Sequence, residues 1–455
     1  MRYRIKVEWE NKDGSLEAAE LGEVQTGVCL SAANVGLKLA AMKEIIGRLQ
    51  EIVIKQQLRR HCEAARPCPV CNAPRSIKDY RTRTLDTVLG RVIVDAPRFD
   101  GCRTCGQRSA MSPLTDLLPN RSLPELHHLQ AKLAADLPYR RATELLRELL
   151  PRTGGVTPMT TRNRTLRIGS AIEAELCQEV DHPQTHPNNA DHLTVGIDGA
   201  FVKAKRDGHM GRRHFEVLTG RIERERGRGE AFAIVRDLDK RAKPKVQAVL
   251  RRAGRTAETA ITVLSDGEDG LRGVVGWFGR KCEHRLDWFH VSRRVEWIRN
   301  QLVHLPSSPV YGCRLAFHSR NLNRIKHQLW NSGIEMADCG MRMFRAGLAE
   351  DAWDSPEFLR RYQSVELRLD ELRSYLYANA KAVQGYAKAF RKGRRVSTAH
   401  VESTVNQLIN WRFCKKQQMS WTRAGAQGLL HVKTAMINGT LARHTGRYQP
   451  LHQAA

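Results

Sequence analysis

The chain has no long apolar stretch. No run of about 18 apolar residues occurs in its 455 residues, and this excludes a transmembrane helix. The first six residues alternate charge with bulk and lack the apolar core of a signal peptide. Internal repeats and low-complexity tracts are also missing. We therefore expect a soluble protein that stays in the cytoplasm, near the nucleoid.

Cysteines do not form the pattern of a disulfide framework. There are eleven, an odd number, and seven of them stand singly, which is typical of a reducing cytosol. The hydrophobic fraction of 41% is enough for sizeable cores and excludes wholesale disorder. The length suggests roughly two to four domains of about 100–200 residues each.

The chain has fewer acidic residues than basic ones. Lys and Arg total 75 against 48 Asp and Glu, so the formal net charge is +27. An excess of this size favours a polyanionic partner, because cations that meet phosphates release condensed counterions. The alternative is a basic protein from an arginine-rich host. Membrane-surface binding is disfavoured, since no basic amphipathic helix with an aromatic face stands out. The charge therefore predicts nucleic-acid binding.

The pattern of apolar residues changes along the chain. The first part predicts an extended piece in 1–25, helices at 32–62, 124–137, 139–150 and 160–180, and two strands at 84–88 and 91–94. A polar linker at 181–191 follows. Strands are then expected at 192–204, 214–219, 231–235, 260–264 and 283–286, with helices at 245–253, 268–278 and from 291. Residues 299–390 contain no convincing strand, and a further helix starts near 397 after the basic run 391–395.

Four cysteines form two CxxC knuckles, Cys68–Cys71 and Cys102–Cys105. Zinc prefers four tetrahedral ligands, and each knuckle directs two sulfurs at one ion. The strands between the knuckles are typical of a zinc ribbon. A redox dithiol is the rival, a catalytic zinc is disfavoured because four thiolates leave no open position, and Cys62 is a substitute ligand. The arginines of the ribbon favour DNA binding over a purely structural role.

The helices at 139–150 and 160–180 suggest a helix-turn-helix. The second begins with Thr160, Thr161, Arg162, Asn163, Arg164 and Thr165, side chains that donate to base edges and phosphates. The break between the helices, Pro151 to Pro158, is longer than the usual three or four residues. An ordinary helical bundle therefore stays open as the alternative.

Three acidic residues lie at positions that suit a metal site. Asp198 lies in an apolar strand, where a carboxylate is costly to bury unless it meets a cation. Asp266 follows the fourth strand of the second half, and ligands of open α/β sheets gather at such carboxyl ends. Glu402 lies early in the helix after the basic run. Three convergent carboxylates can hold two magnesium ions that activate a water or a 3′ hydroxyl. Each acid alone is also explained as a turn residue or a helix N-terminal charge.

The order of four motifs resembles the DDE-type transposases of prokaryotic insertion sequences, which have a ribonuclease H-like core. The motifs are GIDGAFV around Asp198, LSDGEDGL around Asp266, RLDWFHV at 285–291 and HVEST around Glu402. The resemblance is strongest to the ISKra group, related to the eukaryotic Mutator-like elements, and covers roughly residues 60–440. It implies that Asp198, Asp266 and Glu402 bind Mg²⁺ or Mn²⁺, and that Asp287 and His290 orient or contact the scissile phosphate.

Alternatives remain for individual residues. His290 is also readable as a buried structural group. Glu268 and Asp269 compete with Asp266 as ligands, and Glu366 and Glu371 compete with Glu402, although neither has the HVEST context.

The fold class implied is multidomain α/β. The expected parts are an N-terminal strand and helix (1–65), a zinc ribbon (66–110), a helical, helix-turn-helix region (120–180), a ribonuclease H-like core in two pieces (192–298 and 391–440), an all-α insertion (299–390) and a tail (441–455). The function implied is cleavage at element ends and strand transfer to target DNA. The partners would be double-stranded DNA, both terminal inverted repeats and target, and further copies of the chain in the synapse, with no membrane. Rivals are a catalytically silent DNA-binding protein on the same scaffold and a ribonuclease H-like nuclease acting on RNA or junctions.

Overall fold

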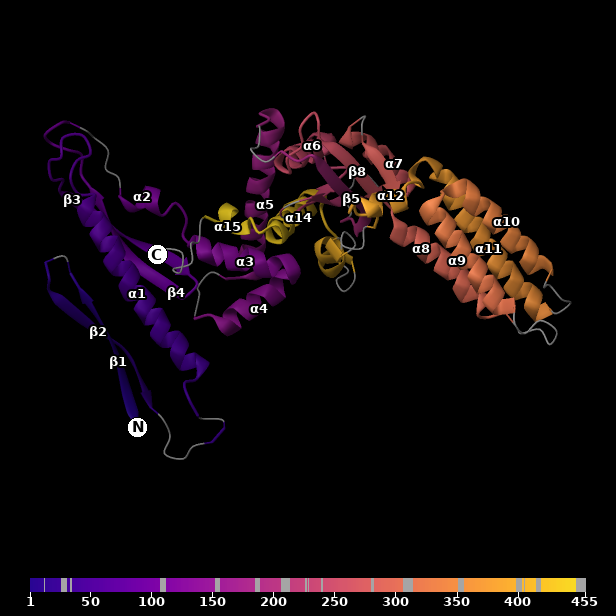
Figure 1. The fold of residues 1–455 in the computed structure, drawn as a ribbon. Helices are drawn as coiled ribbons and strands as arrows, with labels where there is room; N and C mark the ends of the chain where they lie inside the picture. The colour runs from indigo at the N-terminus through magenta and orange to yellow at the C-terminus, as the bar shows by residue number, and fades with distance from the viewer. Residues whose placement is uncertain are drawn as a thin grey trace. The chain divides into compact units, whose positions relative to one another are not determined.

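The computed structural model describes most of the chain. The described residues are 1–11, 13–25, 31–32, 35–106, 112–151, 156–184, 189–205, 213–225, 227, 229–238, 240–279, 282–305, 314–350, 356–397, 403–404, 406–414 and 419–446. The chain divides into two compact units (Figure 1), one made of Met1–Ala171 with Gly439–Ala455 and the other of Ile172–Asn438. Among the described residues, none of the helices combines the length and apolarity that crossing a membrane requires.

The first unit contains two hairpins and a set of helices. Its elements are β1 (Arg2–Glu10), β2 (Leu16–Gln25), α1 (Leu39–Ala64), β3 (Ile77–Thr87), β4 (Gly90–Phe99), α2 (Leu114–Leu117), α3 (Pro124–Asp136), α4 (Tyr139–Leu149), the first half of α5 (Pro158–Asp181), and α15 (Leu441–His444). β1 pairs with β2 and β3 with β4, each pair antiparallel. The first hairpin occupies the segment 1–25 that was predicted to be extended, while the strands of the second hairpin are longer than the predicted 84–88 and 91–94.

Helix α1 packs against the second hairpin. Ile54 and Cys62 of α1 share a buried cluster with Leu85, Val92 and Val94 of the hairpin. The helix begins at Leu39, whereas the apolar spacing predicted a start at residue 32. Gly36 has a φ of +76°, a left-handed conformation that interrupts a right-handed helix, and this accounts for the later start.

The second unit is built on one five-stranded mixed sheet. Its strands are β5 (His192–Lys203), β6 (His214–Arg224), β7 (Glu230–Val235), β8 (Ala260–Ser265) and β9 (Glu283–Leu286), in the order β7-β6-β5-β8-β9. β6 runs antiparallel to both of its neighbours, β5 and β7, while β8 and β9 run parallel to β5. Helices α6 (Ala242–Arg252) and α7 (Asp269–Val275) lie in the connections before β8 and β9. The succession of strands and helices is the one predicted from the sequence.

Alternation along β5 divides the sheet into two faces. Leu193, Val195 and Ile197 are buried in an apolar cluster with residues of α6 and α7. Thr194, Gly196 and Asp198 therefore belong to the opposite face. An aspartate was unexpected in so apolar a strand, and the alternation explains why it is tolerated there.

Helices fill the rest of the second unit. They are α8 (Trp288–Leu302), α9 (Arg314–Asn331), α10 (Ile334–Glu350), α11 (Pro356–Ala378), α12 (Tyr386–Arg391), the π-helix η3 (Asn406–Cys414) and α14 (Arg423–Asn438). α8 to α11 lie side by side as a bundle (Figure 1) around one apolar cluster that includes Val295, Leu322 and Phe344. The described part of 299–390 contains helices and no strand, as the sequence predicted.

α14 closes one edge of the sheet with side-chain amides. Gln427 accepts from the backbone N–H of Val235 at 2.7 Å and donates to the carbonyl of Ala233 at 3.1 Å. Asn438 makes the same pair of bonds with Ala231, at 2.8 and 2.9 Å. These bonds satisfy β7, whose exposed edge would otherwise be a template for pairing with another chain.

A buried ionic cluster joins three helices of the second unit. Glu173 of α5 contacts both the Lys245 ammonium of α6 and the imidazole of His431 in α14. The side chains of Lys245 and His431 are only 1% and 6% exposed. Burial raises the pKa of Glu173, but the bonds from His431 and Lys245 outweigh it and lower that pKa to about 2.

Candidate functional site

Three aspartates lie at corresponding positions of three neighbouring parallel strands, Asp198 within β5 and the other two directly after β8 and β9. Gly196 of β5 pairs with Leu264 of β8, and Leu264 pairs with Arg285 of β9. Two residues further along each strand stand Asp198, Asp266 and Asp287. Because side chains alternate with a period of two, these aspartates extend one row across the three strands. We call them the acid row. The strand registers therefore bring Asp198 and Asp266 to the same edge of the sheet, as the sequence predicted.

The loop after β8 fixes Asp266 through its backbone. The Tyr375 hydroxyl of α11 donates to the Asp266 carbonyl at 2.7 Å, and Asp266 Oδ1 accepts from the Glu268 N–H at 3.0 Å. Gly267 has a φ of +81°, and a Cβ there would lie 2.5 Å from Leu286 Cδ1. The negative charge of Asp266, then burial, raises the pKa of Glu268. The loop therefore concentrates negative charge in a way that a cation would relieve.

Asp287 has a structural task of its own. Its side chain is fully buried and accepts from the Phe289 N–H at 2.8 Å, so it is the N-cap of α8. His290 Nε2 lies 3.7 Å from Asp287 Oδ2 and is 26% exposed. His290 is thus a half-exposed residue at the start of α8, and the interpretation as a buried structural group is wrong.

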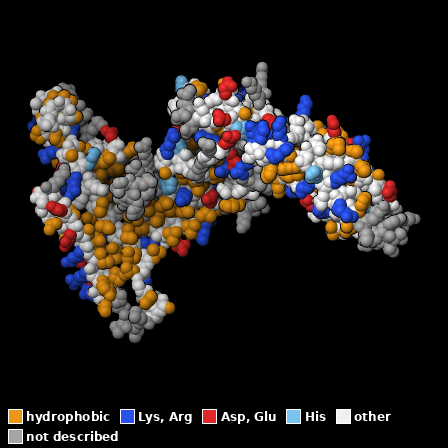
Figure 2. Space-filling model, in the orientation of Figure 1, with side chains coloured by type: hydrophobic (Ala, Val, Ile, Leu, Met, Phe, Trp, Pro, Cys, Tyr) orange, Lys and Arg blue, Asp and Glu red, His pale blue; other side chains and the backbone are white. Residues whose placement is uncertain are grey.

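A cavity of about 610 Å³ opens beside the acid row. Its lining includes the acidic loop residues Asp266, Glu268 and Asp269, the cationic side chains His290, Arg293 and Arg294, and the aromatic residues Phe201 and Tyr375. In Figure 2, Lys and Arg side chains gather over the region around β5, β8 and α7, with Asp and Glu side chains beside them. The cavity therefore offers carboxylates for a cation and guanidinium groups for an anion in one place.

The sequence did not single out the arginines of this cavity. Arg293 and Arg294 lie three and four residues after His290, so one face of α8 presents all three. Arg293 is 3.3 Å from His290 Nδ1, and Arg294 stacks 4.0 Å from the ring centre of Tyr375. The i, i+3, i+4 spacing from His290 is the signal that could have revealed them.

The third predicted acid, Glu402, lies outside the described residues. Thr404, two positions later, is buried, and the π-helix η3 begins at Asn406. The rivals Glu366 and Glu371 lie on α11, where Glu366 contacts Tyr362 and Glu371 pairs with Arg368 at 2.7 Å. Among the described residues, the only group of three or more side chains close enough to share a metal ion is made of cysteines.

That group consists of Cys68, Cys71, Cys102 and Cys105, whose sulfurs all lie within 4.8 Å of one another. Four sulfurs at this spacing suit a tetrahedral zinc ion, so the group could hold a structural zinc. The N–H of Cys105 donates toward Cys102 and, with the contact to Cys71, lowers the pKa of the Cys102 thiol to about 6. Thiolate is the form that binds metal. Cys62, considered as a substitute ligand, instead lies in the apolar cluster with Ile54.

Several arginines near the zinc knuckles are committed to contacts within their own unit. Arg83 donates to the Leu114 carbonyl at 2.7 Å, Arg75 donates to the Ala65 carbonyl at 2.7 Å, and Arg98 pairs with Asp79. Arg91 is exposed but pairs with Asp86 at 2.9 Å. Other cations of the same segment are also exposed: Lys78, Arg81 and Arg103.

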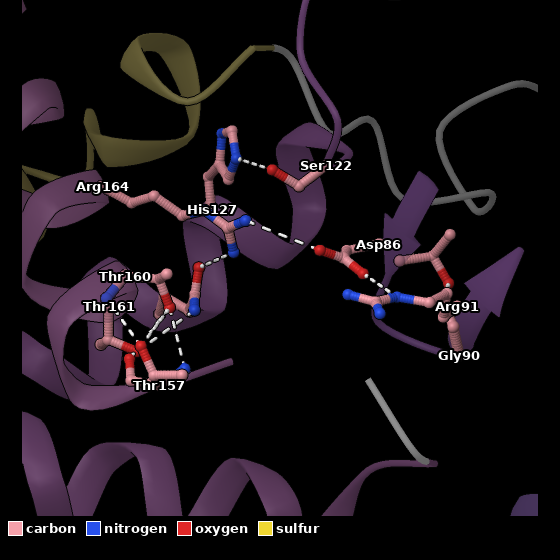
Figure 3. A network of polar contacts seen from close by, with 11 residues as sticks. Asp86, Gly90, Arg91, Ser122, His127, Thr157, Thr160, Thr161 and Arg164 are labelled. Atoms are coloured by element: carbon pink, nitrogen blue, oxygen red, sulfur yellow. Dashed lines mark hydrogen bonds and ion pairs between the residues drawn. The ribbon is translucent and has the colours of Figure 1, made fainter. Parts of the chain in front are cut away.

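The predicted recognition helix is partly committed as well. Thr161 and Thr165 are buried, and Arg164 donates to Gln130 at 2.9 Å and lies 3.9 Å from Asp86 (Figure 3). Exposed positions on the same turn of α5 are Met159, Arg162, Asn163 and Arg167. The helix begins at Pro158, with Thr157 bonded to Thr160 just before it. A surface for nucleic acid on α5 would therefore use Arg162, Asn163 and Arg167.

Comparisons with known proteins give a weak likeness in structure and none in sequence. No protein-family model matches the chain, and no curated protein matches its sequence. Among solved structures, a chain of the Drosophila P element transposase strand transfer complex is similar with a TM-score of 0.35 and 11% identity. The match covers 74% of this chain and 95% of that one. At such a TM-score the likeness supports no functional argument, so any function has to be argued from the residues of the site.

Proposed function

We propose that the chain is a divalent-metal-dependent DNA transposase of the DDE type, resembling the ISKra group, that cuts at element ends and joins them to target DNA. The observation that carries this proposal is the acid row across three parallel strands, beside a cavity that is also lined by arginine side chains. The strand order and directions fit a ribonuclease H-like core. The net charge of +27 supports a nucleic-acid substrate, and the four cysteines support a zinc-containing DNA-binding region.

Asp198 and Asp266, with Glu402 as third acid, would hold Mg²⁺ or Mn²⁺. Bound ions of this kind activate a water or 3′ hydroxyl and stabilise the leaving oxygen in phosphodiester cleavage. The protein's own contribution is positional. Tyr375 and Gly267 fix the backbone of the Asp266 loop, so the carboxylate needs no rearrangement when a cation arrives. The charge of Asp266, together with burial, raises the pKa of Glu268, so negative charge is concentrated in this loop.

The arginines on α8 would hold the substrate. Arg293 and Arg294 line the same cavity as Asp266, and guanidinium groups bind phosphate oxygens in a fork geometry. Asp287 orients the start of α8 as its N-cap, and His290 stands between that cap and Arg293. In this scheme Asp287 is a positioning residue, and His290 is the residue that can contact a phosphate.

The test is strand cleavage on a labelled duplex that carries both flanks of the encoding element. Wild type is compared with Asp198→Ala, Asp266→Ala and Glu402→Ala, in Mg²⁺, in Mn²⁺ and without added divalent metal. Leaving metal out, rather than adding a chelator, keeps zinc in place. Asp269→Ala is the matched control, because Asp269 lines the same cavity but its side chain is 89% exposed and pairs with Arg272.

We expect metal-dependent nicking that disappears in the three test variants while binding to the ends persists. Undiminished cutting by Asp198→Ala refutes the proposal. If Asp269→Ala is inactive and Asp266→Ala is active, the metal ligand of the loop is Asp269. Tight binding without cleavage under every metal condition would favour a catalytically silent DNA-binding protein, and cleavage of RNA or junctions alone would favour a nuclease.

A further inference from the structure

A second cavity of about 610 Å³ lies at the opposite end of β5 and is rich in cations. Its cationic lining residues are Arg221, Arg224, Lys392, Arg394 and Arg395, and its acidic ones are Glu223 and Glu225. We call it the basic cavity. Lys392, Arg394 and Arg395 belong to the segment just after α12, in the basic run 391–395. Two distant parts of the chain, β6 and this segment, thus place like charges around one hollow.

The basic cavity shares a sheet face with Asp198. His192 and Thr194 line the cavity, and both are an even number of residues from Asp198 along β5. The three side chains therefore belong to the same face of the sheet. Arg221 is the cross-strand partner of Gly196, and Glu223 is the partner of Thr194. Cross-strand partners point to the same face, so Arg221 lies between the cavity and the acid row.

The two acids of the cavity offset only part of its positive charge. Glu223 contacts Arg395, and its Oε1 lies 3.6 Å from Arg221 Nε. Glu225 is the second acid, and the two face five Lys and Arg side chains in the lining. Burial, followed by the charge of Arg394, lowers the pKa of His192, while Glu225 acts in the opposite direction. The cavity therefore keeps an excess of positive charge.

The spacing of the two places matches the dimensions of DNA. His192 and Thr194, the β5 residues that line the cavity, precede Asp198 by six and four residues, which corresponds to about 13–20 Å at roughly 3.3 Å per residue. Base pairs rise about 3.4 Å each, so this is the axial length of about four to six base pairs. We propose that the basic cavity binds the phosphate backbone of the DNA that is cut at the acid row, about four to six base pairs from the scissile phosphate. This proposal rests on the function proposed above.

Phosphate binding is tested through the salt dependence of the affinity for DNA. The double variant Lys392→Ala/Arg394→Ala removes two cavity cations. Lys388→Ala/Arg391→Ala is the matched control, because it removes the same charge from positions of α12 that do not line the cavity. Fluorescence anisotropy with a labelled 30-base-pair duplex, roughly the length that covers both places with flanks, gives the binding constant from low to high salt. Divalent metal is omitted, so that no cleavage occurs.

The slope of log K against log salt has a magnitude of about 0.9 for each phosphate that the protein neutralises. We expect the slope of the cavity variant to be smaller in magnitude than that of wild type by about 1.8, since two cations are removed. The control should change the slope by less than half as much. Equal slopes for the cavity variant and wild type, or for the cavity variant and the control, overturn the proposal.

A second arm uses ATP as a free phosphate ligand. If ATP binds wild type and not the cavity variant, while duplex binding is the same in both, the cavity is a free-anion site and the DNA assignment is wrong. Because these readouts need no catalysis, they remain valid if the chain proves unable to cut DNA. Conversely, if the chain cuts DNA and the cavity variant has the wild-type salt dependence, the proposal for the basic cavity fails while the proposed function stands.

Discussion

Removing one carboxylate, Glu173, should destabilise the second unit strongly. Glu173→Gln removes the carboxylate that contacts the ammonium of Lys245, a side chain only 1% exposed. Breaking a buried pair in this way costs about 3–5 kcal/mol. The pKa of Glu173 gives an independent figure: its fall from 4.5 to about 2 corresponds to about 3 kcal/mol, at about 1.36 kcal/mol per pKa unit. The two figures agree, so the expected loss of unfolding free energy is about 3 kcal/mol.

The assay is hydrogen exchange of α6 and α14 amides at neutral pH, which reports on this unit alone. A loss of about 3 kcal/mol corresponds to roughly a hundredfold loss of protection, at about 1.4 kcal/mol per factor of ten. Asp181→Asn is the control on the same helix, because Asp181 and its partner Arg241 are 56% and 38% exposed, and such surface pairs contribute under about 1 kcal/mol.

The same cluster predicts a pH dependence and a rescue. A depressed carboxyl pKa gives stability that is present above about pH 4.5 and is lost as the pH falls toward about 2. Wild type should therefore lose protection over that window more steeply than Glu173→Gln. The double variant Glu173→Gln/Lys245→Met should recover part of the loss, since it also removes the buried charge that the Glu173 carboxylate balances. Protection in Glu173→Gln within about 0.5 kcal/mol of wild type would refute the reasoning, because even a modest buried pair exceeds that.

Three further outcomes are expected. Cys102→Ser should release zinc, measured by metal analysis of the purified chain, and loosen the β3–β4 hairpin; a variant that keeps full zinc content would contradict the four-sulfur site. Gly267→Ala should destabilise the loop after β8, because its Cβ would lie 2.5 Å from Leu286 Cδ1 at a φ of +81°, and a thermal midpoint equal to wild type would count against the geometry. Asp287→Ala should cost about 0.5–2 kcal/mol through loss of the N-cap, whereas Asp287→Asn should keep most of the stability. Activity retained by the Asn variant and lost by the Ala variant would mean that Asp287 acts as a cap, while loss in both would assign a role to its charge.

Much of the sheet could be predicted because its signals are local. Apolar runs with β-branched residues mark β5, β7 and β8, and turn residues separate them. The boundaries of α1 and of the first two hairpins were harder, since Gly36 and the charged exposed positions of those strands obscure the periodicity. The adjacency of Asp198 and Asp266 followed from one assumption, that both strands run parallel side by side.

The remaining features depend on contacts between distant residues, which periodicity does not encode. No local pattern links Tyr375 to the Asp266 carbonyl, 109 residues away in sequence, or Arg395 to Glu223. The role of Asp287 as an N-cap could have been inferred, because an Asp between a strand and a helix is a common helix start. The helix-turn-helix prediction named Thr161, Thr165 and Arg164 as contacts, yet amphipathicity alone would have assigned the two threonines to the buried side.

The acid row is set by strand register, and this has a consequence for how such a chain can change over time. Each aspartate is held by the ladder of hydrogen bonds beside it, whereas the connections between the strands carry no part of that alignment. Insertions in the β6–β7 loop can accumulate without shifting any acid along its strand, whereas α11 has to keep Tyr375 on the Asp266 carbonyl. A slip of a single residue in β8, by contrast, would turn Asp266 to the other face. The molecule therefore combines a sheet that tolerates almost no change in length with a loop that is free to vary.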